Sequence, residues 1–136
     1  MAATVFVDAG FLAAFLVARD SNHAWAVAQP RRFPPPWHTC DAVLSETLHL
    51  IGQHAFTPLS SLIRGGAVVS SFRFADSTNE VLALMERYAD VPMSFADACL
   101  VRMTETAPDP SLLTTDTDFR IYRRHGRKTI PCVLPA

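Results

Sequence analysis

Acidic side chains occupy five positions of this chain where charge is costly: Asp8, Glu46, Asp97, Asp116 and Asp118. Asp8 and Asp116 each follow a short apolar run, while Glu46 and Asp97 lie within otherwise apolar segments of helical periodicity. If folding brings the carboxylates together, each pair at about 4 Å costs roughly 1 kcal/mol in water and about 4 kcal/mol near a protein surface. A hard divalent cation with oxygen ligands would offset that repulsion. The pattern therefore predicts a cation site.

Each acid also has a purely structural interpretation. Asp97 follows Ser94 at the spacing of a capping box, in which the acid reaches back to the helix cap. Glu46 would be a solvated residue of an exposed helix face. The others are plausible turn or cap residues: Asp8, Asp116 and Asp118. Asp118 stays open between a site residue and a cap. The combination of the five, rather than any one of them, favours a site.

The elements that must position these acids alternate along the chain. Apolar, β-branched runs predict strands at residues 4–8, 37–40, 67–72, 111–115 and 130–134. Helical spacing predicts helices at residues 11–18, 23–29, 41–51, 56–64, 78–90 and 94–106. This alternation indicates a three-layer α/β/α fold with a central parallel sheet of about four to five strands. Ligands of such sheets bind beyond the carboxyl ends of the strands, where we expect Asp8 and Asp116 to meet.

Two local features complete the predicted framework. Asp41 is expected to cap the third predicted helix, with Leu44, Leu48 and Ile51 on one face. Residues 30–36 contain three consecutive prolines and are expected to lack regular structure.

Composition limits the class of protein. The chain has 136 residues, a net charge of −1 and 49% hydrophobic residues, so we expect one domain spanning residues 1–136. No apolar run approaches the roughly 18 residues of a membrane helix, and no secretory signal is apparent, so a cytoplasmic protein is expected. The three cysteines argue against a disulfide framework and a zinc site: Cys40, Cys99 and Cys132. The five histidines show no metal-ligand spacing.

The order and spacing of the acidic segments resemble the PIN-domain family, in particular ribonuclease toxins of the VapC type. The matching segments are residues 5–8, 44–48, 94–98 and 113–119, and the resemblance extends from about residue 4 to residue 134. One departure concerns Gly10. The family often has a hydroxyl residue there, so the resemblance predicts a missing hydrogen bond beside the metal and a weaker metal affinity.

The resemblance implies a metal-dependent endoribonuclease. Mg²⁺ or Mn²⁺ would be bound by Asp8, Asp97 and Asp116, with Glu46 acting directly or through water. The catalytic set would then comprise these four acids and Asp118. The metal would polarise a phosphate, and an oriented water would attack in line. No serine, cysteine or histidine nucleophile is required.

An RNA substrate needs positive charge around an acidic pocket. The first group of candidates follows Asp118 directly: Arg120, Arg123, Arg124, Arg127 and Lys128. Each of them could equally be a solvated surface residue. The pair Arg31-Arg32, in the proline-rich segment, is a second candidate.

Partners and competing functions remain open. A toxin would have a cognate antitoxin, whereas a stand-alone PIN nuclease in RNA processing would not. A phosphoacceptor switch of the receiver type is a third candidate, but the first strand offers one acid only, Asp8, and the only lysine is Lys128. Residues 11–18 carry more large apolar side chains than one buried face requires, which predicts a homodimer and an apolar groove for an antitoxin segment.

Overall fold

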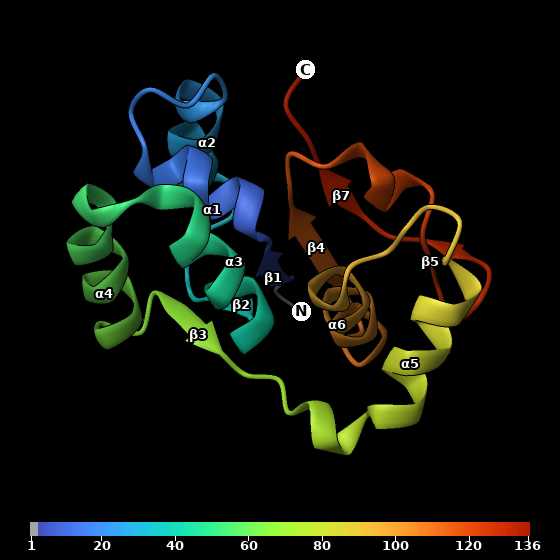
Figure 1. The fold of residues 1–136 in the computed structure, drawn as a ribbon. Coiled ribbons are helices and arrows are strands. Elements are labelled where there is room, and N and C mark those ends of the chain that lie inside the picture. Colours follow the sequence, from blue (N-terminus) through green and yellow to red (C-terminus); the bar gives the residue numbers. More distant parts are fainter. Residues whose placement is uncertain (1–2) are drawn as a thin grey trace.

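The central sheet is the element that positions the acids. A computed structural model describes residues 3–136 and contains a parallel sheet of five strands in the order β3-β2-β1-β4-β7 (Figure 1). The strands are β1 (Thr4–Val7), β2 (Trp37–Thr39), β3 (Val68–Ser70), β4 (Pro110–Leu113) and β7 (Cys132–Val133). Two further strands form a small antiparallel hairpin: β5 (Arg123–Arg124) and β6 (Lys128–Thr129). The predicted parallel sheet is therefore confirmed.

Six α-helices flank this sheet within the described residues. They are α1 (Ala9–Leu16), α2 (His23–Ala28), α3 (Asp41–Ile51), α4 (Phe56–Arg64), α5 (Thr78–Arg87) and α6 (Phe95–Glu105). Short 3₁₀ helices are η1 (Gln29–Arg31), η2 (Gln53–Ala55), η3 (Phe74–Asp76) and η4 (Thr117–Arg120). Helix α1 packs against α2 and α3, and α5 packs against α6 (Figure 1). The three-layer α/β/α architecture agrees with the prediction. None of the helices described is long and apolar enough to cross a bilayer.

The pairing of β1 with β4 brings together two segments that lie more than 100 residues apart in the sequence. Phe6 lies opposite Leu112 and Val7 opposite Leu113, and all four side chains are buried. Because the strands run parallel and in register, the residue after each strand lies at the same edge of the sheet. Asp8 therefore emerges beside the segment that begins at residue 114.

Helix α1 uses its apolar side chains inside the molecule. Phe11 and Leu12 have no exposed surface, and Phe15 packs edge-on against Trp37 with ring centroids 5.0 Å apart. Most apolar side chains of residues 11–18 therefore pack inside the molecule, against the sheet and against helices α2 and α3. The apolar surplus of this segment gives little support to the predicted homodimer, which stays a prediction.

Helix α3 departs from its predicted orientation. Its fully buried positions are Val43, Thr47 and Ile51, whereas Leu48 is 47% exposed. Of the predicted face, Ile51 is buried and Leu44 is partly buried, so the prediction is wrong for Leu48 only. Thr47 can be buried because its hydroxyl donates to the Val43 carbonyl at 2.8 Å. Because threonine is polar, the sequence pattern assigned Thr47 to the exposed face of α3.

Two predicted boundaries also need correction. Asp41 is not the cap of α3, because Cys40 occupies that position and Asp41 accepts a hydrogen bond from Ser70 instead. The proline-rich segment is partly regular, since Pro30 lies in the 3₁₀ helix η1. Proline fits a first helical turn, where its φ is suitable and no N–H is needed. The rest of the segment is irregular, as expected.

Candidate active site

Four of the five acids line one cavity at the carboxyl edge of the sheet. The cavity has a volume of about 230 Å³, and its acidic lining is Asp8, Glu46, Asp97 and Asp116. These residues come from the end of β1, from α3, from the first turn of α6 and from the end of β4. The predicted convergence of Asp8 and Asp116, which are separated by most of the chain, is present in the structure.

Asp8 is the most enclosed of the four acids, with 6% of its surface exposed. It caps α1 by accepting a hydrogen bond from the Phe11 amide at 2.8 Å, and its other oxygen accepts one from the Thr114 hydroxyl. Burial raises the pKa of Asp8 to about 7, and repulsion from Asp116 and Asp97 adds to the rise. The two hydrogen bonds act in the opposite direction. The cap and the site interpretations of Asp8 are thus compatible.

Asp97 is half-buried at the start of α6. Its amide donates to the Ser94 hydroxyl at 3.0 Å, so half of the predicted capping box is present. Its carboxylate accepts a hydrogen bond from the Tyr122 hydroxyl at 3.0 Å. Burial raises the pKa of Asp97, and the nearby Asp116 raises it further. The backbone of Asp97 closes the helix end while its side chain remains available to the cavity.

Asp116 follows β4 in a partly buried turn that opens η4. Its amide donates to the Thr114 hydroxyl at 2.9 Å, and its own carboxylate accepts from the Asp118 amide at 2.9 Å. Thr114, fully buried, therefore links Asp116 to Asp8. Asp118 does not line the cavity. Asp118 contacts the acids of the cavity only through the hydrogen bond from its amide to Asp116.

Glu46 differs from the other three because it is exposed on α3. Its side chain still lines the cavity, where partial burial and then repulsion from Asp97 raise its pKa. An exposed acid with a raised pKa can exchange protons with water at the cavity mouth. The interpretation of Glu46 as a plain solvated residue is therefore incomplete.

Two supporting residues were missed by sequence reasoning. Thr114 and Tyr122 each donate a hydroxyl to an acid of the cavity, Asp8 and Asp97 respectively. Thr114 had a weak signal, since it is polar in a buried run. Tyr122 had no signal in the sequence, because it is 25 positions from Asp97 and only the fold brings its hydroxyl to that carboxylate. Burial raises the pKa of Tyr122, and Asp97 raises it further, so it stays a hydrogen-bond donor.

The donor set of the cavity fits a hard divalent cation. Every candidate ligand is a carboxylate oxygen. Burial is the main cause of the raised pKa of Asp8 and of Asp97, repulsion between the acids adds to it, and a bound cation would favour the charged forms against both. Within residues 3–136, however, no three Asp, Glu, His or Cys side chains already stand together as a ready ligand group. Mg²⁺ commonly keeps several waters and binds through one or two carboxylates, so the cavity suits partly hydrated ion binding.

The predicted basic residues fall into two groups. Arg123 donates to the carbonyls of Arg120, Ile121 and Tyr122, and Arg124 donates to the Ala107 carbonyl at 3.0 Å. Both guanidinium groups therefore stabilise local backbone. The other three are exposed: Arg120, Arg127 and Lys128.

Arg120 shares a cavity with Arg32. The cavity has a volume of about 510 Å³ and extends along the chain from Thr129 to Leu134. The two exposed arginines come from η4 and from the segment after η1, so the fold joins the two predicted basic groups. Arg120 lies in η4, which begins directly after Asp116, although this cavity and the acidic cavity share no lining residue.

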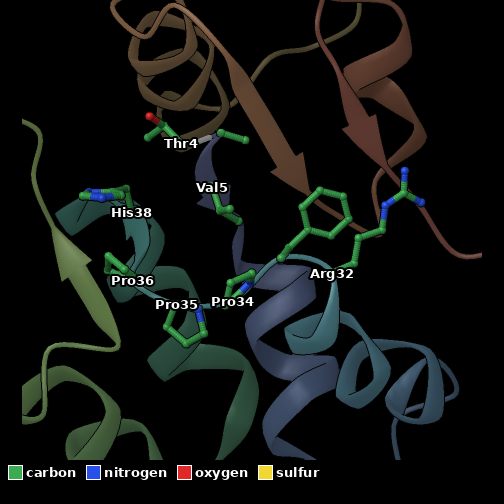
Figure 2. Close-up of a pocket in the computed structure, with 9 residues that line it drawn as sticks. Thr4, Val5, Arg32, Pro34, Pro35, Pro36 and His38 are labelled. Carbon is green, nitrogen blue, oxygen red and sulfur yellow. The ribbon is translucent and has the colours of Figure 1, made fainter. Parts of the chain in front are cut away.

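A further cavity lies under the proline-rich segment and lacks acids. It has a volume of about 440 Å³ and is bordered by Thr4, Val5, Arg32 and His38, with Pro34–Pro36 along one side (Figure 2). Thr4 opens β1 and Pro36 precedes β2, so this cavity faces the amino ends of those strands. Its position and lining separate it from the candidate active site.

Comparison with known proteins agrees with this fold. The profile of the PIN domain matches residues 5–124, so the chain belongs to the PIN-domain family. Among solved structures, it resembles Mycobacterium tuberculosis VapC20, described as a toxin that cleaves the sarcin-ricin loop, with a TM-score of 0.74. The match has 24% sequence identity and covers 84% of this chain and 91% of VapC20. No curated protein matches the chain significantly by sequence.

Proposed function

We propose that this chain is a Mg²⁺- or Mn²⁺-dependent endoribonuclease and the toxin of a type II toxin-antitoxin pair, acting in the cytoplasm as one domain spanning residues 1–136. The observation that carries the proposal is the convergence of four acids from four elements: Asp8, Glu46, Asp97 and Asp116. Membership of the PIN-domain family supports a nuclease. The fold shared with VapC20, a toxin that cleaves the sarcin-ricin loop, supports the toxin role.

In this proposal Asp8, Asp97 and Asp116 hold the cation. A bound Mg²⁺ or Mn²⁺ would polarise the scissile phosphate and activate a water. Thr114 fixes the orientation of Asp8 through its hydroxyl, and Tyr122 does the same for Asp97. Glu46, at the exposed side of the cavity, takes the proton from the attacking water.

The fifth acid, Asp118, supports the site without binding the cation in this proposal. Asp118 donates its amide to Asp116 at 2.9 Å and thereby fixes the turn that presents Asp116 to the cavity. Its own carboxylate is proposed to act on water or RNA at the rim rather than on the ion.

Cleavage assays test the proposed function directly. A labelled single-stranded RNA should be cut by the wild-type protein in Mn²⁺ or Mg²⁺ and left intact in EDTA, because the carboxylates alone repel phosphate. The same assay with a double-stranded RNA serves as a comparison, with less cleavage expected. Equal cleavage in EDTA, or none with either metal, would contradict the proposal.

Two alternatives are separated by specific observations. A stand-alone PIN nuclease would lack a neighbouring small gene for a DNA-binding antitoxin, which makes gene context the deciding observation. A receiver-type switch is disfavoured by the strand order β3-β2-β1-β4-β7 and by Lys128, which lies exposed in the β5-β6 hairpin. Receiver sheets follow the order 2-1-3-4-5.

RNA would approach along the exposed arginines Arg32 and Arg120, which line one cavity. Replacing both, in Arg32→Ala/Arg120→Ala, should weaken binding of a single-stranded RNA and reduce the slope of log K against log salt by roughly 1–2, because each phosphate contact contributes about 0.7. Arg64→Ala, at the exposed end of α4, is the control and should change neither value. Fluorescence anisotropy in EDTA measures binding without cleavage. An unchanged salt slope would exclude this path.

The homodimer and the antitoxin groove stay predictions. The apolar surface that we now propose for them lies on α3 rather than on residues 11–18. Leu48 and Leu50 are 47% and 60% exposed on α3, where they form an open apolar surface. Leu50 also lines the acidic cavity, so an apolar antitoxin segment on this surface would lie beside the active site. A strictly monomeric protein at high micromolar concentration by light scattering would count against the dimer.

A further inference from the structure

Gly10 lies against the side chain of Thr115. A Cβ atom at position 10 would stand 2.2 Å from the Thr115 hydroxyl oxygen, a distance that real Cβ atoms essentially never show. The same Cβ would be 3.6 Å from the Thr115 Cβ and 3.6 Å from Asp8 Oδ1, both ordinary contacts. Gly10 is part of α1 and has no positive φ. Space for one oxygen atom, not backbone conformation, therefore requires glycine here.

The Thr115 hydroxyl fills the volume that a side chain at position 10 would take. Gly10 and Thr115 both line the acidic cavity, together with Asp8 and Asp116. The hydroxyl and Asp8 Oδ1 are both close to the position that a Cβ atom of residue 10 would take. The acidic cavity thus has a hydroxyl in its wall, although the sequence has glycine where the resemblance led us to expect one.

The two adjacent threonines have different tasks. Thr114 is fully buried, and its hydroxyl is committed to Asp8 and to the Asp116 amide. Thr115 is only partly buried, and its hydroxyl makes no hydrogen bond to another residue of the described chain. It is therefore free to donate to, or accept from, a molecule inside the cavity.

We propose that the Thr115 hydroxyl is a positioning group for the water shell of the bound cation, in the volume that Gly10 leaves free. This inference rests on the proposed function. A partly hydrated Mg²⁺ or Mn²⁺ needs hydrogen-bond acceptors for its waters, and a hydroxyl beside Asp8 supplies one that carries no further charge. Groups that orient metal ligands typically contribute 10–100-fold to metal affinity. The predicted loss of a hydrogen bond at position 10 is thereby compensated.

The first arm of the test measures the contact without metal. Gly10→Ala should lower the melting temperature by roughly 5 °C or more, because the new methyl group meets the Thr115 oxygen. The same change in a Thr115→Ala background should cost little, because the Cβ atoms are an ordinary 3.6 Å apart. An equal cost of Gly10→Ala in both backgrounds would overturn the inferred packing.

The second arm measures the hydroxyl. Thr115→Val keeps the volume and removes the hydroxyl, so Mn²⁺ affinity by calorimetry should fall by roughly 10-fold. Thr115→Ser keeps the hydroxyl and should bind Mn²⁺ like the wild type. Thr57→Val, at an exposed position of α4, is the matched control and should change nothing. A Thr115→Val protein that binds Mn²⁺ with wild-type affinity would overturn the inference while leaving the proposed function intact.

A transfer of the hydroxyl completes the test. In Gly10→Ser/Thr115→Ala the oxygen reaches the same volume from the opposite wall, so this variant should recover Mn²⁺ affinity relative to Gly10→Ala/Thr115→Ala. A structural role alone would give equal affinities for the two double variants. If the wild type binds no Mn²⁺, the proposed function fails and this inference fails with it, whereas failure of recovery with a metal-binding wild type contradicts the inference alone.

Discussion

Asp97→Asn should remove RNA cleavage and leave the fold intact. The amide of residue 97 donates to Ser94 whatever the side chain is, and an Asn oxygen can still accept from the Tyr122 hydroxyl. The substitution therefore removes one negative charge from the cavity and little else. A metal ligand stabilises the transition state by several kcal/mol, so the cleavage rate should fall by roughly 100-fold or more, about 3 kcal/mol.

The decisive measurement compares cleavage rates of folded proteins at saturating Mn²⁺. Circular dichroism and melting curves establish that the Asp97→Asn protein is folded. Asp90→Asn, in the exposed turn after α5, is the matched control and should cleave like the wild type. A folded Asp97→Asn protein with the wild-type rate would show that the cavity is not the active site, and the capping role would then be sufficient to explain Asp97.

The metal-free protein should become more stable as the pH falls from about 7 to about 4. Burial raises the pKa of Asp8 from 3.8 to about 7, so in this range the folded state holds a proton that the unfolded chain has released. The free energy of unfolding therefore decreases as pH rises through this window, and the effect levels off above the folded pKa. One pKa unit corresponds to about 1.4 kcal/mol, so the full effect amounts to a few kcal/mol. Thermal melting in EDTA across this range measures it.

Removal of the buried charge should abolish most of that dependence. Asp8→Asn retains an oxygen for the Phe11 amide, and at pH 8 in EDTA it should melt several degrees above the wild type. Asp116→Asn should act in the same direction, because the charge of Asp116 raises the pKa of Asp8. Mn²⁺ should stabilise the wild type increasingly as pH rises, and both variants less. Asp90→Asn is again the control.

The opposite result would be equally informative. If both variants melt below the wild type in EDTA, and Mn²⁺ adds nothing to the wild type, then the acids act as caps and turns. The hydrogen bonds of Asp8 to Phe11 and Thr114 would in that case outweigh the cost of burying its charge.

The fold was largely predictable because its signals are local. The run at residues 4–8 has the β-branched and aromatic composition of a buried strand, and the carboxyl end of a parallel strand has a fixed meaning for function. Predictions failed where a polar residue is buried or a proline fits a helix. Thr47 is buried because its hydroxyl donates to the carbonyl of Val43, and Pro30 lies in the 3₁₀ helix that begins at Gln29. Sequence patterns read a polar residue as an exposed position and a proline as the end of regular structure.

The sequence by itself determined that Asp8 and Asp116 should meet at the carboxyl edge of the sheet, because the ends of buried strands are local properties of the sequence. Asp97 was assigned to the same site by the resemblance to the PIN-domain family, since its spacing to Ser94 is explained by a helix cap alone. Only the tertiary structure decided which neighbours complete that site. Tyr122 reaches Asp97, and Thr115 occupies the space beside Gly10, through contacts between segments far apart in sequence. Such contacts depend on side-chain packing, which no periodicity or spacing in the sequence records.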